Sequence, residues 1–197
     1  MTEVLLFHHV LGRTPGVLAL AERFRAAGHV VHVPDLYDGH VFATIDEGFA
    51  YAQSRPDLDE RADAVAAELP ENLVYAGISY GAMHAQRLAQ TRPGAAGALL
   101  LEGCVPLTGP WAFGPWPDGV PVQIHGMADD PYFSGEGDLD AAREIVALVG
   151  DGAELVLHPG AEHLFADDSL PSYDAVAAGE LVGRALGFLD RIGLRER

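Results

Sequence analysis

The sequence predicts an α/β protein with a doubly wound, mostly parallel six-stranded sheet and helices on both faces. Short apolar runs alternate along the chain with longer segments in which apolar residues recur every three or four positions. The apolar runs are continuous, which is typical of strands that are buried on both faces of a parallel sheet. With 197 residues, of which 49% are hydrophobic and 21% charged, the chain is expected to form one globular domain, residues 1–197.

Turn and cap residues delimit each predicted element. Pro15 opens the first helix and Gly28 closes it, Pro70 ends the third helix, and Gly150 follows the fifth. The strands are expected at 4–8, 30–33, 73–76, 98–101, 120–125 and 154–157, in the order 2-1-3-4-5-6 across the sheet. The helices are expected at 15–27, 45–53, 57–69, 82–90, 138–149 and 173–191, with Asp138 as the cap of the fifth.

The charge balance excludes several classes of partner. Twelve basic residues stand against 29 acidic ones, a net charge of −17, so the surface should repel nucleic acid and anionic membranes. No apolar run approaches the length of a membrane span, and the N-terminal residues lack the basic region of a signal peptide. The single cysteine, Cys104, excludes an intrachain disulfide. A cytoplasmic location is therefore expected.

Residues 77–81 read Gly-Ile-Ser-Tyr-Gly and lie between the third predicted strand and the helix that follows it. A G-x-S-x-G sequence in this setting is the nucleophile elbow, a strained turn that exposes a serine hydroxyl above the sheet. Gly77 and Gly81 are needed because side chains there would collide with neighbouring backbone. The alternative is that Ser79 only caps the helix.

A serine nucleophile needs a base, and the base needs an acid that orients it. In α/β-hydrolases the acid and then the histidine follow the serine, in loops at the carboxyl ends of later strands. After the fifth strand Asp129 and Asp130 compete for the acid, and the spacing favours Asp129. After the sixth strand His163 is favoured over His158, because it lies further out on the loop, where it could reach Ser79.

The chain resembles the dienelactone hydrolase family of α/β-hydrolases. The segments that carry the resemblance are 8–12, 34–37, 77–81, 125–129, 160–165 and 173–189. It implies a minimal α/β-hydrolase fold and a triad of Ser79, Asp129 and His163. It also implies an oxyanion hole formed by the backbone N–H groups of Tyr80, after the nucleophile, and Val10, in the loop after the first strand.

The sequence departs from the archetypal family members at three places. Serine stands at the elbow instead of cysteine, and His9 stands in place of a glutamate that helps to activate the thiol. Where those members carry an arginine for the substrate carboxylate, the chain has an acidic residue, in the sequence Phe-Ala-Asp at 165–167. We therefore expect a serine hydrolase for a neutral ester, lactone or thioester, acting through an acyl-enzyme intermediate.

The segment 105–117 is too rich in proline for a helix or a central strand. Its aromatic residues Trp111, Phe113 and Trp116 are candidate pocket walls, although a packed surface loop or a partner contact fits the sequence as well. His9, near the expected oxyanion hole, is a candidate substrate contact or a hydrogen-bonded core residue.

No cofactor is expected, because no strand leads into a nucleotide-binding glycine motif and no cysteine or histidine cluster has zinc spacing. His84, in the helix after the elbow, and Cys104, outside any elbow, are expected to be structural. The rival interpretation is a hydrolase-fold protein that has lost catalysis and binds a small ligand or a protein partner.

Overall fold

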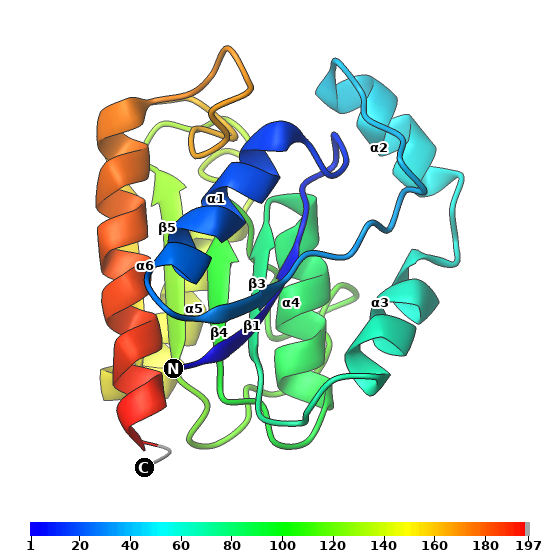
Figure 1. Ribbon diagram of the computed structural model, residues 1–197. Coiled ribbons are helices and arrows are strands. Elements are labelled where there is room, and N and C mark those ends of the chain that lie inside the picture. The colour runs from blue at the N-terminus through cyan, green and yellow to red at the C-terminus, as the bar shows by residue number, and fades with distance from the viewer. Residues whose placement is uncertain (196–197) are drawn as a thin grey trace.

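The computed structural model describes residues 1–195, and its centre is one sheet of six parallel strands in the order β2-β1-β3-β4-β5-β6. The strands are β1 (Glu3–Phe7), β2 (Val30–His32), β3 (Val74–Ile78), β4 (Gly97–Leu101), β5 (Val122–Met127) and β6 (Ala153–His158). All neighbouring pairs are parallel. In Figure 1 the strands point upward, so their carboxyl ends meet at the top of the molecule.

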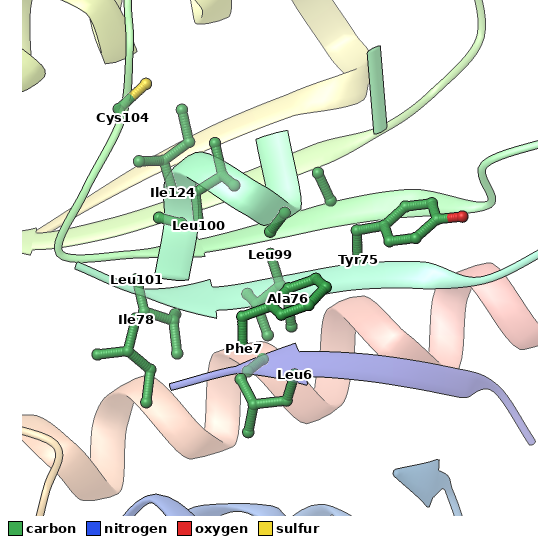
Figure 2. Packing of buried hydrophobic residues seen from close by; sticks show 14 of the residues in the cluster. Leu6, Phe7, Tyr75, Ala76, Ile78, Leu99, Leu100, Leu101, Cys104 and Ile124 are labelled. Atoms are coloured by element: carbon green, nitrogen blue, oxygen red, sulfur yellow. The ribbon is translucent and has the colours of Figure 1, made fainter. Parts of the chain in front are cut away.

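The central segments form strands of a covered sheet because their residues are buried on both faces. Every residue of β3, β4 and β5 is buried, as expected where helices cover both sides of a parallel sheet. Leu6 of β1 pairs with Ala76 of β3, which in turn pairs with Leu99 of β4. Figure 2 shows these side chains within the central hydrophobic core.

The helices begin at the polar residues that cap them. The Thr14 hydroxyl accepts a hydrogen bond from the Val17 N–H at the start of α1, and Thr44 forms a reciprocal capping box with Glu47 at the start of α2. The helices are α1 (Pro15–Ala26), α2 (Ile45–Gln53), α3 (Leu58–Ala67), α4 (Tyr80–Thr91), α5 (Asp138–Val149) and α6 (Ala175–Arg195). α1 packs beside α6, and α4 packs beside α3 and against β1, β3 and β4.

The predicted fold class and strand order are confirmed. Most element boundaries differ by one or two residues, and the last helix continues to Arg195. Asp138 is the first residue of α5 and not its cap, because its carboxylate accepts a hydrogen bond from the Cys104 N–H instead. Within residues 1–195, no helix combines the length and the apolar character of a membrane span.

Candidate active site

The turn between β3 and α4 has the strained geometry of a nucleophile elbow. Ser79 has φ 50° and ψ −117°, a conformation that non-glycine residues rarely adopt and that costs about 1–3 kcal/mol. Its N–H donates to the Leu101 carbonyl at 2.6 Å, which fixes the turn to the end of β4. The Ser79 side chain does not cap α4, so the helix-cap alternative does not describe this serine.

The two glycines of the elbow are required by close backbone approach. A Cβ at Gly77 would lie 2.1 Å from the Gly81 carbonyl oxygen. A Cβ at Gly81 would lie 2.5 Å from the carbonyl oxygens of Phe7 and His8, at the end of β1. The lack of side chains therefore lets the start of α4 sit directly on the end of β1, beside the loop that contains Val10.

Three side chains from separate loops form a hydrogen-bonded line at the carboxyl end of the sheet. Ser79 Oγ lies 2.8 Å from His163 Nε2, and His163 Nδ1 lies 2.7 Å from Asp130 Oδ2. The Nδ1 atom donates to the carboxylate, so Nε2 is free to accept the serine proton. Asp130 is fully buried, and its other oxygen accepts from the Tyr132 N–H at 2.8 Å. This arrangement can deliver a serine oxygen as a nucleophile.

The expectation that Asp129 would face the histidine is wrong. Hydrogen bonding between the two strands continues past β5, because the N–H groups of Ala128 and Asp129 donate to the carbonyls of His158 and Gly160 at 2.9 Å. The chain therefore turns one residue later than the spacing predicted, and the carboxylate beneath the imidazole is that of Asp130. Asp129 is exposed.

The surroundings of His163 favour its protonated form. Burial by itself would lower the pKa of this imidazole, but the hydrogen bond to Asp130 and the charges of Glu102, Asp130 and Asp138 outweigh it and raise the pKa above 6.5. A raised pKa makes His163 a stronger base. It also means that the neutral, proton-accepting form is lost at a less acidic pH than for a free histidine.

Glu102, at the end of β4, is a second carboxylate in the site that sequence reasoning missed. Its Oε2 atom lies 4.0 Å from His163 Nδ1 and accepts hydrogen bonds from the N–H groups of Leu164 and Phe165, the latter at 3.2 Å. Burial, aided by the charge of Asp130, raises the pKa of Glu102 to about 7 against the opposing effects of His163 and the two N–H groups. The one available signal was an acidic residue directly after a strand that is buried on both faces.

Ligand atoms of Glu102, Asp130 and His163 lie within 4.8 Å of one another, and in the described part of the chain this is the group that could be mistaken for a metal site. The hydrogen bonds above account for the cluster. A cation there would have to displace the contact between Asp130 and His163, or the backbone donors to Glu102.

The donors expected for an oxyanion lie around the elbow. Tyr80 is the first residue of α4, and an N–H group in the first turn has no acceptor within its own helix. Val10 is buried in the turn that follows β1, and the start of α4 packs against the backbone of Phe7 and His8 just before this turn. A Cβ at Gly48 of α2 would lie 2.2 Å from the Val10 carbonyl oxygen, so α2 holds this turn from the other side.

His9 is a buried anchor and not a pocket wall. It is 0% exposed, and its Nδ1 accepts from the Leu11 N–H at 3.3 Å while its Nε2 donates to Asp167 Oδ2 at 2.8 Å. Asp167 also accepts hydrogen bonds from Thr14 and from the N–H and hydroxyl of Ser169. These contacts join the loop after β1 to the loop that carries His163, the candidate catalytic base. The substrate-contact alternative for His9 is therefore wrong.

The aromatic residues of segment 105–117 do not line the groove at the candidate site. Trp116 is buried and donates to the Val120 carbonyl at 2.8 Å, whereas Trp111 is 70% exposed. Gln90 of α4 donates to the Gly114 carbonyl at 2.5 Å. Gln90 follows Ser79 by three helical turns, about 16 Å along the axis. The segment thus packs along α4, and Trp111, Phe113 and Trp116 are not walls of the groove beside His163, contrary to the prediction.

A groove of about 420 Å³ opens beside His163, within the usual range for a small-molecule site. Tyr132 forms part of its wall, and its ring centroid lies 4.7 Å from that of His163. The other lining residues come from the loops at the carboxyl ends of the strands and from the start of α2, and they are Leu11, Ala43, Ile45, Pro131, Ala161, Glu162, Leu164, Leu170, Pro171 and Ser172. Apart from His163, none of the lining residues is basic.

Three further buried titratable groups lie outside the hydrogen-bonded line of the site. His158, the rejected candidate for the base, lies at the end of β6, and its Nε2 is 3.0 Å from His125 Nδ1. Burial lowers the pKa of His158, and it lowers that of His125 to about 3, so both rings are neutral. Cys104 is 1% exposed, and burial raises the pKa of its thiol well above the usual value, which disfavours the thiolate.

The model of the dienelactone hydrolase family matches residues 1–193. Among solved structures, a dienelactone hydrolase-like promiscuous phosphotriesterase from metagenomic libraries has a TM-score of 0.75 at 17% identity, over 98% of this chain and 87% of that chain. Esterase 2 of Thermogutta terrifontis, phosphoramylated by tabun, has a TM-score of 0.68 at 21% identity, over 98% of this chain and 83% of that chain. These likenesses establish the α/β-hydrolase fold. No curated protein matches the chain.

Proposed function

The chain belongs to the dienelactone hydrolase family, and from that premise we propose that it is a serine hydrolase for small neutral esters, lactones or thioesters. Family membership supports an ester-hydrolase-type enzyme. The finer proposal rests on one observation, the line of hydrogen bonds from Ser79 Oγ through His163 to Asp130. A hydroxyl, an imidazole and a buried carboxylate in that order are the parts that acyl transfer to serine requires.

In the proposed reaction the Ser79 oxygen attacks the substrate carbonyl while His163 Nε2 accepts its proton. Asp130 keeps the imidazole in the correct tautomer and stabilises its cationic form. The N–H groups of Tyr80 and Val10 donate to the oxyanion, aided by the positive end of the α4 dipole. His163 then protonates the leaving group, and a water molecule releases the acyl group by the reverse sequence of proton transfers.

The groove favours uncharged substrates. Its walls are mainly apolar, its one charged lining residue besides the candidate base is Glu162, and the whole chain carries −17. An anionic substrate would find no lysine or arginine among the lining residues and would be repelled by the acidic surface. A neutral ester with a short apolar acyl chain is the substrate class that this lining fits.

The test is a panel of p-nitrophenyl esters of rising acyl length, each assayed with the wild-type protein and with Ser79→Ala. We expect turnover that is greatest for short acyl chains and that Ser79→Ala lowers by about 10⁴-fold or more, as for a nucleophile in a triad. A carboxylated ester of equal length should be a worse substrate than its neutral counterpart. No turnover of any ester or thioester would support the rival interpretation, a binding protein. Turnover that survives Ser79→Ala would show that another residue is the nucleophile.

A further inference from the structure

Two carboxylates approach the same nitrogen of His163. Asp130 Oδ2 lies 2.7 Å from Nδ1 and Glu102 Oε2 lies 4.0 Å from it. Both side chains are fully buried, so neither charge is shielded by water. Burying a second carboxylate is costly unless its contacts compensate, and a site that only had to hold the imidazole in place would need just one.

The backbone at both ends of the Glu102 contact is strained. Among residues 1–195, four non-glycine residues have positive φ, and three of them are Ser79 (50°), Glu102 (58°) and Leu164 (62°). Glu102 and Leu164 are joined to each other, because Glu102 Oε2 accepts the hydrogen bond of the Leu164 N–H. Such strain persists where surrounding contacts impose it, and it gathers at functional sites.

The loop that carries Glu102 is held rigidly on every side. The Glu102 N–H donates to the His125 carbonyl at 2.7 Å, and two residues further on the Cys104 N–H donates to Asp138 at 3.0 Å. A Cβ at Gly103 would lie 2.6 Å from the Ser79 carbonyl oxygen, so this loop abuts the elbow. Glu102 is therefore fixed relative to the nucleophile as well as to the histidine.

One Glu102 oxygen remains without a hydrogen-bond partner. Oε2 accepts from Leu164 and Phe165, whereas Oε1 is buried with no partner among the described residues. An anchor that served structure alone would be expected to satisfy both oxygens, because an unpartnered buried acceptor is destabilising. Besides the two N–H groups on Oε2, the charge of Glu102 gains a cationic counterpart when the neighbouring imidazole is protonated.

We propose that Glu102 is a second acidic positioning residue of the site, which orders the backbone after His163 and shares with Asp130 the stabilisation of the imidazolium. The proposal rests on the proposed function, since it concerns the same histidine. It predicts that Asp130 supplies only part of the negative charge that stabilises the protonated form of His163. The titratable groups that face the imidazole are Glu102 after β4, Asp130 and the Tyr132 ring after β5 and, at longer range, Asp138 at the start of α5.

The first test is the loss of activity in Asp130→Asn. Removal of the acid costs about 10⁴-fold in kcat where a triad has only one carboxylate. With Glu102 still in place we expect a loss of about 10²-fold, and a loss of about 10⁴-fold in the double variant Asp130→Asn/Glu102→Gln. A loss of about 10⁴-fold in Asp130→Asn alone, with no further loss in the double variant, would overturn the proposal.

The second test is the pH profile of Glu102→Gln, because a merely structural role would not move it. The Glu102 carboxylate favours the protonated form of His163. Its removal should therefore shift the acidic limb of the kcat/KM profile by about 0.5 to 1 pH unit toward lower pH. We expect kcat to fall about tenfold with KM unchanged, and Glu102→Asp to recover part of the loss. Glu144→Gln, the same substitution on the exposed face of α5, should leave both the limb and kcat unchanged.

An acidic limb that stays in place in a folded Glu102→Gln variant would overturn the proposal. If that variant does not fold, as judged by its thermal melt, Asp130→Asn by itself still decides, because a loss of about 10⁴-fold in that single variant would overturn the proposal. Failure of the proposed function looks different. In that case the wild-type protein and Ser79→Ala have equal activity or none, whereas failure of the present inference leaves a Ser79-dependent enzyme that is indifferent to Glu102.

Discussion

The substitution Asp167→Asn tests whether the buried contact between His9 and Asp167 joins the loop after β1 to the histidine loop. Asp167 is 2% exposed, and each of its oxygens accepts two hydrogen bonds. An asparagine amide replaces one of these oxygens with a donor. Hydroxyls can rotate, but the Nε2–H of His9 cannot move to Nδ1, which already accepts from Leu11. One fixed donor therefore loses its acceptor, whichever way the amide points.

The expected loss of folding stability in Asp167→Asn follows from the pKa of Asp167. Burial opposes ionisation, but the hydrogen bonds from His9, Ser169 and Thr14 outweigh it and lower the pKa from 3.8 to about 2. This difference corresponds to about 2 kcal/mol of stability at neutral pH, and an orphaned buried donor costs about 1–3 kcal/mol in its own right. The two effects overlap, so we expect a total loss of about 2–3 kcal/mol at pH 7.

The pH dependence has a definite sign. Because the folded-state pKa is the lower one, the contribution of Asp167 is complete above 3.8 and is lost as pH falls toward 2. The free energies of unfolding of the wild-type protein and Asp167→Asn, measured by chemical denaturation, should therefore differ by about 1 kcal/mol less at pH 3 than at pH 7. The matched control is Asp168→Asn, whose exposed carboxylate is 4.0 Å from Arg23.

An exposed ion pair of this kind contributes about 0–1 kcal/mol, so Asp168→Asn should change the free energy of unfolding by less than that at either pH. Equal losses in Asp167→Asn and Asp168→Asn would contradict a stabilising role for the buried contact. So would a gap between wild type and Asp167→Asn that is the same at pH 3 and pH 7.

Three further outcomes follow from the site. Asp129→Asn should leave kcat/KM within about twofold of wild type, whereas Asp130→Asn should lower it about 100-fold, and equal effects of the two substitutions would contradict the assignment of the acid. Because the pKa of His163 is raised, kcat/KM should fall to half its maximum at a pH above 6.5 as the solution is acidified, and a midpoint below 6.5 would count against His163 as the base. Trp111→Ala should leave KM for short esters unchanged, and a severalfold rise in KM would place this side chain in the groove after all.

The parts of the site that the sequence predicted are those encoded by local geometry. The elbow was recognisable because a strand, a Gly-Ile-Ser-Tyr-Gly turn and a helix follow one another directly in the chain. His163 was recognisable because the sixth strand ends at His158 and leaves a loop on which a second histidine lies further out. Parallel strands bring both features to the same edge of the sheet.

The parts that the sequence did not predict depend on contacts between distant segments. The choice between Asp129 and Asp130 depended on how far hydrogen bonding continues beyond β5 and β6, which no spacing within one loop reveals. The sequence alone does not single out Glu102, because its relation to His163 exists only after β4 and the histidine loop come together. The aromatic segment 105–117 was misplaced because glutamine side chains of α4 fix its position.

The most direct test of the account is covalent labelling by a fluorophosphonate, read by intact mass and by peptide mapping. If Ser79 is activated by His163 and Asp130, the wild-type protein should gain one phosphonyl group, located on Ser79, and Ser79→Ala should gain none. A wild-type protein that hydrolyses esters but carries the label on another residue, or carries none after prolonged exposure, would contradict the assignment of Ser79 as the nucleophile.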